Sequence, residues 1–130
     1  MSPGEFGTSI MSNDNVGPVK RLLDALRFSF QGLNQAWRSE VAFRYEIYVL
    51  IFALPAAWIL GGGAVKRALL IASALLVVVV EMINSAVEAV VDRIGPQRHE
   101  LSGRAKDLGS AAVFCAIMLA SVVWLVLLLD

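Results

Sequence analysis

The stretch that decides the fold is residues 68–92, which read ALLIASALLVVVVEMINSAVEAVVD. Its first thirteen residues carry no charge, which is enough to commit the segment to a bilayer. Polar side chains then appear before the apolar run has ended, and they recur at helical spacing: Glu81, Asn84, Ser85, Glu88 and Asp92. Positions i, i+3, i+4, i+7 and i+11 share one face of a helix, so one stripe of an otherwise apolar helix carries carboxylates, an amide and a hydroxyl.

Two acids inside a membrane segment need a physical reason. Placing one carboxylate in hydrocarbon costs about 2.5–3.5 kcal/mol on insertion scales. One interpretation is a structural polar seam that holds helices together; the other, which we favour, is a site that handles cations or protons. Three helices cannot easily hide two carboxylates from lipid by themselves, so we expect a homo-oligomer that buries the acidic face.

The composition of the chain is that of a single-domain membrane protein. Hydrophobic residues make up 58% of the 130 residues and charged residues 17%, and the mean hydropathy is +0.70. The formal net charge is zero, so no overall field would attract nucleic acid, and no nucleic-acid partner is expected. The single cysteine, Cys115, lies within an apolar run and is expected to be a packing residue.

The hydropathy pattern predicts an all-α membrane protein with three transmembrane helices and a preceding amphipathic helix on the membrane surface. Residues 1–18 are polar and glycine-rich, and we expect a disordered tail whose first ten residues are left over from an expression vector. Apolar residues at helical spacing predict the surface helix over about residues 19–44. The apolar runs predict spans over about residues 47–63, 68–91 and 108–129, with a polar loop over Asp92–Asp107.

The distribution of basic residues predicts the orientation. Five lie before the first span and four lie in the Asp92–Asp107 loop, whereas only Lys66 and Arg67 lie between the first and second spans. The positive-inside rule then puts the N-terminus and the Asp92–Asp107 loop in the cytoplasm and Asp130 outside. The acids of the second span therefore lie in its inner half.

This topology gathers acids and cations at one face of the membrane. At 1.5 Å per residue, Glu88 lies about 6 Å below Asp92, and Glu81 lies about 10 Å deeper. Glu40 and Glu46 flank the start of the first span on the same side. Carboxylates from two segments are ligands that Mg²⁺ uses beside nucleotide phosphates, and the loop offers side chains to bind phosphate: Arg98, His99, Arg104 and Lys106.

Acids for a metal, cations for phosphates and an apolar groove suit phosphoryl transfer to a lipid. From the residues alone, a small ion-coupled carrier fits an acid-lined helix equally well. Such a carrier should present acids to both sides of the membrane, whereas residues 68–80 are apolar except for Ser73. A non-catalytic membrane adaptor is a third alternative.

Two strings, EMINSAVEAVVDRIG at residues 81–95 and HELSGRAKDLGSAAV at residues 99–113, resemble the bacterial integral-membrane diacylglycerol kinases. The resemblance extends back through AWRSEVAFRYE and RLLDALRFSFQGL to about Lys20. It implies a homotrimeric enzyme of the bacterial inner membrane that moves the γ-phosphate of MgATP to 1,2-diacylglycerol, giving phosphatidic acid. An undecaprenol kinase, which acts on a polyprenyl alcohol, is the nearest alternative because it needs the same acidic stripe.

The resemblance also implies roles for individual residues. Glu81 matches the general base for the lipid hydroxyl, with support from Asn84. Glu40 and Glu88 match the pair that holds Mg²⁺ on ATP. The implied ATP-binding residues are Arg21, Phe28, Glu40, Glu88, Gln97, Arg98, His99, Lys106 and Asp107. The implied lipid-binding residues are Arg21, Ala25, Ser29, Phe30, Asn34, Gln35, Ala36, Trp37, Arg44, Arg67, Glu81, Ser110 and Trp124.

The sequence departs from the family pattern in three places. Phe28 stands where a tyrosine is common, which removes a hydroxyl that could bond the nucleotide. Gln97 and Arg98 replace a more acidic or aromatic pair, and the glycines at residues 61–63 replace acidic residues. None of these departures touches the acidic stripe.

Overall fold

The computed structural model describes residues 16–130, and within this range it contains four α-helices and no strand. The helices are α1 (Pro18–Ser39), α2 (Val41–Leu60), α3 (Ala64–Ile94) and α4 (Glu100–Leu129). The chain divides into two compact units, with the boundary after Gln35. Most of the tail predicted over residues 1–18 lies outside the described residues.

Helix α1 begins at Pro18, a residue suited to the first turn because its missing N–H needs no partner there. Its large apolar side chains, such as Leu22 and Phe30, are exposed, as in a helix whose apolar face lies in a membrane interface. Glu40 has an extended backbone (φ −105°, ψ 111°) and separates α1 from α2. The predicted surface helix is therefore five residues too long, and residues 41–44 begin α2 instead.

Helices α2, α3 and α4 are each long and apolar enough to cross a membrane, which confirms the predicted all-α class with three candidate spans. The polar loop predicted over Asp92–Asp107 is much shorter, because α3 continues to Ile94 and α4 already begins at Glu100. The side chain of His99 caps α4 by accepting a hydrogen bond from the N–H of Leu101 at 3.1 Å. A polar first turn with such a cap has the composition of a loop, which explains the error.

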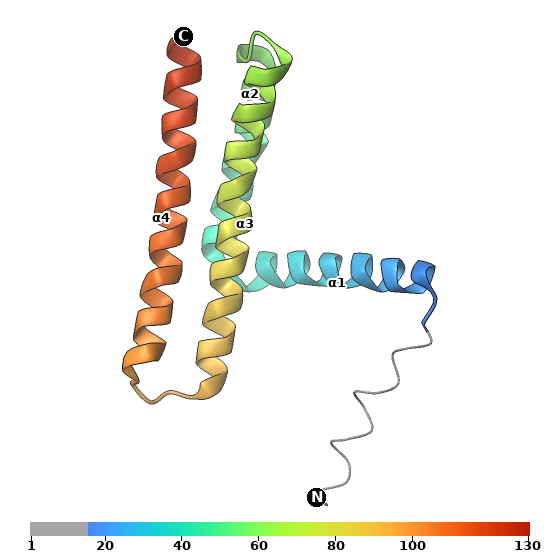
Figure 1. Ribbon diagram of the computed structural model, residues 1–130, viewed down its shortest axis with the longest axis vertical. Helices are drawn as coiled ribbons and strands as arrows, with labels where there is room; N and C mark the ends of the chain where they lie inside the picture. The colour runs from blue at the N-terminus through green and yellow to red at the C-terminus, as the bar shows by residue number, and fades with distance from the viewer. Residues whose placement is uncertain (1–15) are drawn as a thin grey trace, which may run out of the picture. The chain divides into compact units, whose positions relative to one another are not determined.

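Helix α3 packs against both α2 and α4. Figure 1 shows α3 and α4 side by side, running in opposite directions and joined by a short turn. The buried core lies mainly between α2 and α3, where Phe43 and Leu50 pack with Val78, and Ala36 joins them. At the C-terminal end of α3, Gly95 has φ +136°, a conformation that favours glycine and lets the chain turn towards α4.

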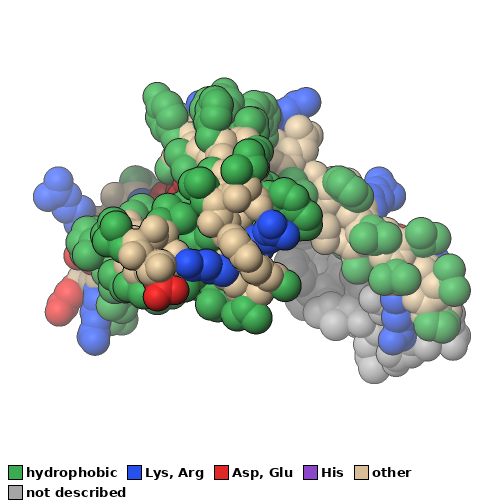
Figure 2. All heavy atoms as spheres, turned by 90° about the horizontal axis from the view of Figure 1, so that it is seen from above, with side chains coloured by type: hydrophobic (Ala, Val, Ile, Leu, Met, Phe, Trp, Pro, Cys, Tyr) green, Lys and Arg blue, Asp and Glu red, His purple; other side chains and the backbone are tan. Residues whose placement is uncertain are grey.

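Most large apolar side chains of α2, α3 and α4 face outward. Phe52, Ile59 and Leu129 are each more than 75% exposed. Figure 2 shows hydrophobic side chains over much of the visible surface, with charged groups in small clusters. Exposing such an apolar surface to water is energetically unfavourable, whereas contact with lipid or with another membrane helix suits it.

Candidate functional site

The polar stripe of α3 runs from a buried acid to an exposed one. Glu81 is 6% exposed and Asn84 is 8% exposed, whereas Glu88 is half-buried and Asp92 is exposed. The side-chain amide of Asn84 donates a hydrogen bond from Nδ2 to Oε1 of Glu88 at 3.3 Å. These contacts show that the stripe predicted from spacing is formed, and that it leads from the interior of the helices to their surface.

Acids at the start of α2 interact electrostatically with this stripe of α3. The carboxylate of Glu81 interacts electrostatically with Glu88 on α3 and with Glu40 at the α1–α2 junction. Glu46, on the second turn of α2, also interacts electrostatically with Glu81. Because like charges repel, this cluster of four acids favours a cation, a proton or a hydrogen-bond donor in its midst.

Sequence reasoning placed Glu46 with Glu40 among the acids at the cytoplasmic face but gave it no individual role. Its Oε2 atom is buried and has no hydrogen-bond partner among the described residues. A buried acceptor without a partner loses the hydrogen bonds that water would supply, so this atom is suited to receive a donor from a ligand. The available signal was an acid six residues after Glu40 at the start of an apolar run, but the sequence could not say that it would face Glu81.

The packing of α4 against Asn84 depends on a glycine. A Cβ atom added at Gly109 would collide with Oδ1 of the Asn84 side chain. Glycine in a helix costs about 1 kcal/mol relative to alanine, so the position is explained by the close approach. Oδ1 of Asn84 is buried and has no hydrogen-bond partner among residues 16–130.

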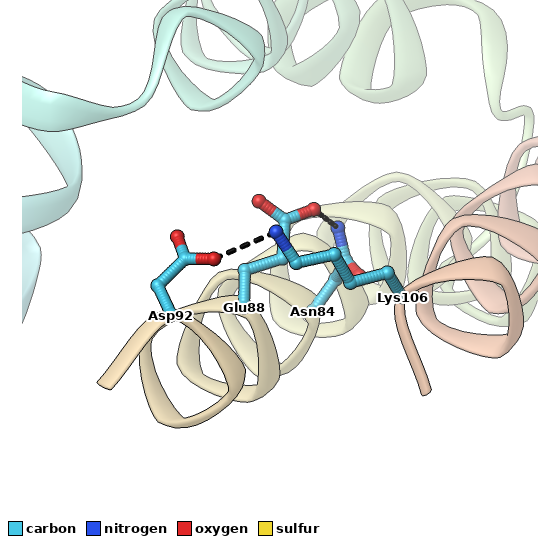
Figure 3. A network of polar contacts seen from close by, with 4 residues as sticks. All are labelled: Asn84, Glu88, Asp92 and Lys106. Atoms are coloured by element: carbon cyan, nitrogen blue, oxygen red, sulfur yellow. Dashed lines mark hydrogen bonds and ion pairs between the residues drawn. The ribbon is translucent and has the colours of Figure 1, made fainter. Parts of the chain in front are cut away.

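At the exposed end of the stripe, a cation from α4 joins the acids. The ammonium Nζ of Lys106 lies 2.7 Å from Oδ1 of Asp92 and interacts electrostatically with Glu88. Figure 3 shows Lys106 reaching across to the two acids, with Asn84 bonded to Glu88 behind it. This arrangement brings together the predicted residues Asn84, Glu88 and Lys106.

A hollow of about 550 Å³ adjoins this network at the α3–α4 turn. Its lining includes three residues predicted to bind ATP, namely Gln97, Arg98 and His99, together with Lys106. The Nδ1 atom of His99 is engaged in capping α4, so any ligand contact by this ring uses Nε2. The fifth residue of this region that was predicted to bind ATP, Asp107, is exposed on the first turns of α4.

A second cavity, of about 480 Å³, lies between α2, α3 and α4. Its walls are mostly apolar, and Glu46, Ser121 and Trp124 supply the polar atoms together with Tyr45. The indole N–H of Trp124 donates to the carbonyl of Leu70 at 3.1 Å, so it holds α4 to α3. A narrow apolar space with an unpartnered carboxylate on its wall is suited to an aliphatic ligand that carries a hydroxyl.

Not all predicted lipid-binding residues gather near Glu81. Arg67 lies on the first turn of α3, fourteen residues before Glu81, which corresponds to about 21 Å along a helix. Its guanidinium lies over the ring of Trp58, 4.8 Å from the centroid. Ser110 is exposed on α4.

The remaining predicted residues belong to α1 and the start of α2. Ala36 is buried in the core, the ring of Trp37 lies edge-on to Tyr48 at 6.0 Å, and Nη1 of Arg44 donates to the carbonyl of Trp37 at 2.9 Å. The unit that ends at Gln35 carries the others: Arg21, Ala25, Phe28, Ser29, Phe30, Asn34 and Gln35.

Among residues 16–130, no three His, Cys, Asp or Glu side chains gather closely enough to enclose a metal ion. Glu40 and Glu88 each interact electrostatically with Glu81, and carboxylate oxygens are the ligands that Mg²⁺ prefers. Two carboxylates fit a cation that takes its other ligands from phosphates and water. The residues present are therefore compatible with Mg²⁺ brought by a nucleotide.

The family model and the similar proteins all belong to one family of kinases. Residues 27–128 match the family model described as prokaryotic diacylglycerol kinase. The chain is 51% identical to a diacylglycerol kinase of Escherichia coli over 119 residues, which cover 91% of this chain and 96% of the relative. It is 48% identical to the diacylglycerol kinase of Haemophilus influenzae over 82% of this chain and 90% of the relative. Identity to the Pseudomonas aeruginosa diacylglycerol kinase is 44%, over 86% of this chain and 91% of the relative.

Proposed function

Because this chain belongs to the prokaryotic diacylglycerol kinase family, we propose that it transfers the γ-phosphate of MgATP to the hydroxyl of 1,2-diacylglycerol, giving phosphatidic acid. The observation that carries the proposal is the buried carboxylate of Glu81, which has Glu40 and Glu88 within electrostatic reach. A structural seam would pair the buried acid with a donor or a cation. The electrostatic neighbours of the Glu81 carboxylate are instead other acids, and the nearby ammonium of Lys106 pairs with Asp92.

Glu81 is proposed as the general base. Its carboxylate takes the proton of the lipid hydroxyl while the hydroxyl oxygen forms a bond to the γ-phosphorus. The bond between that phosphorus and the bridging oxygen breaks, and ADP leaves with the electron pair. Proton transfer to a positioned base contributes typically 10²–10⁴-fold, and the rest of the acceleration comes from holding both substrates in line.

Glu40 and Glu88 are proposed to hold Mg²⁺ on the nucleotide phosphates, where it offsets the negative charge of the transferring group. The hydrogen bond from Asn84 fixes the orientation of the Glu88 carboxylate. Asn84 thereby supports the proposed metal ligand, and Gly109 supports Asn84 by leaving space for its side chain. Support of the base by Asn84 is proposed from the family resemblance.

The hollow at the α3–α4 turn is proposed to receive the phosphates of ATP. Lys106 lines it, and its ammonium is the group best placed to reach a phosphate near Glu88. Arg98 and His99 line the same hollow. Family resemblance adds Arg21, Phe28, Gln97 and Asp107 to the proposed nucleotide contacts.

The cavity between α2, α3 and α4 is proposed to hold part of the lipid. Its apolar walls suit an acyl chain, and the unpartnered Oε2 of Glu46 suits a glycerol or hydroxyl group next to Glu81. Trp124 lines this cavity, which supports the lipid contact inferred for it from the family. The distance between Arg67 and Glu81 implies that Arg67 meets the far end of a lipid chain or a neighbouring lipid.

We further propose a homotrimer in the bacterial inner membrane, with the α3–α4 turn in the cytoplasm where ATP is available. The basic residues around that turn support this orientation. Glu40 and Glu88 remain half-exposed in one subunit, so a neighbouring subunit would complete their shielding from lipid.

The decisive experiment measures transfer of label from γ-labelled ATP into lipid with purified protein in mixed micelles, with and without Mg²⁺. Parallel reactions contain 1,2-diacylglycerol or undecaprenol. We expect Mg²⁺-dependent labelling of phosphatidic acid and little labelling of undecaprenol. Labelling of undecaprenol alone would overturn the substrate, and no transfer to either alcohol by well-folded protein would overturn the proposed function.

A further inference from the structure

The ammonium of Lys106 interacts with two acids of α3 that are one helical turn apart. It forms an ion pair with Asp92, with Nζ 2.7 Å from Oδ1, and its charge also interacts with Glu88. The Asp92 side chain is 66% exposed and that of Lys106 is 43% exposed, whereas Glu88 is half-buried. Lys106 therefore has a choice of partners, and it is paired with the one nearer to solvent.

Pairing with Glu88 would have a different consequence. A carboxylate and an ammonium attract more strongly where the surroundings are less polar, so Glu88 would be a strong partner if Asp92 were absent. An ammonium bound to Glu88 would neutralise the acid and occupy the space needed by a cation. The existing pair with Asp92 is exposed and therefore weak, so an incoming anion can replace it.

We infer that Asp92 is a positioning residue that holds Lys106 at the exposed end of the stripe, away from Glu88, until a polyphosphate arrives. Glu88 thereby stays available for a divalent cation, and Lys106 stays close to the hollow that the phosphates would enter. This inference rests on the proposed function for its purpose, but the choice of partner by Lys106 is a property of the protein without ligands.

A water-soluble carbodiimide tests this choice directly, since it condenses a carboxylate with an adjacent amine into an amide with loss of water. Cross-links of the intact protein without metal or nucleotide are mapped by mass spectrometry. We expect a Lys106–Asp92 link in the native protein. In Asp92→Asn we expect a Lys106–Glu88 link to increase at least about fivefold, and in Asp92→Glu we expect the link to stay at position 92.

The opposite end of the helices supplies a matched control. Lys66 and Asp130 form a second ion pair, with Nζ 3.6 Å from Oδ2, so their cross-link reports reagent activity in every sample. Asp130→Asn removes the side-chain carboxylate and should reduce that link, while the Lys106–Asp92 link should stay unchanged. If Lys106 in folded Asp92→Asn forms no link to Glu88 while the Lys66–Asp130 link is normal, the inference is wrong.

The consequence for the cation is tested by Mn²⁺ binding, followed by electron paramagnetic resonance without nucleotide, and by the Mg²⁺ dependence of lipid phosphorylation. We expect Asp92→Asn to weaken Mn²⁺ binding and raise the Mg²⁺ needed for half-maximal activity by about three- to tenfold, with little change in the KM for lipid. Adding Lys106→Gln to Asp92→Asn should restore Mn²⁺ binding.

Lys106→Gln by itself distinguishes positioning from simple charge effects. If Asp92 keeps Lys106 off Glu88, this single change leaves Mn²⁺ binding within twofold of the native protein. If the two charges only add at long range, it tightens binding about as much as Asp92→Asn weakens it, and that outcome contradicts the inference. Failure of the proposed function would instead appear as absent lipid phosphorylation in the native protein, with the cross-links unaffected.

Discussion

The two ends of the three-helix unit use charge in different ways. At the end near the glycine turn of residues 61–63, Lys66 pairs with exposed Asp130, and Arg67 lies over the ring of Trp58. At the other end, which we call the acidic end, Lys106 pairs with Asp92, and the buried Glu81 has other acids as its electrostatic neighbours. The glycine-turn end pairs its acid with a cation, whereas the acidic end holds a buried carboxylate among other carboxylates. A buried acid among acids marks the end where a ligand has to supply positive charge or protons.

Glu81→Gln should give the largest effect, because it changes the buried acid at the centre of the acidic end. The amide keeps the shape of the side chain but cannot accept the proton of the lipid hydroxyl, so lipid phosphorylation should fall by about 10²–10⁴-fold. The expression level should match that of the native protein, and gel filtration should show the same assembly. Asp130→Asn, a change of the same kind at the glycine-turn end, is the control. Near-native activity in Glu81→Gln would disprove its role as the base.

Glu88→Ala should shift the metal dependence. Loss of a proposed ligand should raise the Mg²⁺ concentration for half-maximal activity by at least about tenfold. Mutation of residues that only hydrogen-bond to metal ligands already lowers metal affinity by about that factor. The measurement is a Mg²⁺ titration at saturating ATP and lipid. Asp130→Ala, which removes an exposed acid at the opposite end of the helices, is a control for total charge. An unchanged titration curve would remove Glu88 from the metal site.

Gly109→Ala should damage the acidic end without removing any polar group. The new methyl group would collide with the Asn84 side chain, and overpacking typically costs about 1–3 kcal/mol. We expect a lower thermal midpoint and about tenfold less activity. Gly32→Ala is the matched control, because this glycine also lies inside a helix and a Cβ there meets nothing within 4 Å. Equal behaviour of the two variants would show that Asn84 can move without consequence.

Glu46→Gln should sharpen the division between lipid and nucleotide contacts. If Oε2 of Glu46 accepts a hydrogen bond from the lipid, the KM for diacylglycerol should rise by about two- to tenfold, the value of one hydrogen bond. The KM for ATP should change little. Initial rates at varied lipid mole fraction measure the first, and rates at varied ATP the second. A change confined to the KM for ATP would contradict the proposed position of the lipid.

Asp130→Asn should have the smallest effect. The Lys66–Asp130 pair is largely exposed on its acid side, and such pairs contribute about 0–1 kcal/mol. Activity should stay within twofold of native, and the thermal midpoint should move little. A large loss of activity would mean that the glycine-turn end also takes part in the reaction.

Much of this arrangement was predictable from the sequence. Helical spacing predicted the stripe of α3, hydropathy predicted the three spans, and the resemblance to diacylglycerol kinases is confirmed by the family match. The start of α4 was not predictable from hydropathy, because a polar helical turn and a loop have similar composition. The role of Glu46 depends on how α2 rotates against α3, and the contact of Gly109 with Asn84 depends on the depth of α4 packing. The spacing of residues along the sequence specifies neither the rotation of α2 nor the packing depth of α4.

The length of α3 has a consequence of its own. Its 31 residues span about 46 Å, whereas the hydrocarbon core of a bilayer is about 30 Å thick. Roughly one third of the helix therefore lies in the headgroup layer or beyond it. Asp92, near the end of the helix, lies in this part because the helix is longer than the hydrocarbon core is thick. A thicker bilayer would draw Glu88 and Lys106 towards the hydrocarbon, so the thickness of the host membrane should tune how readily a water-borne nucleotide reaches a lipid alcohol.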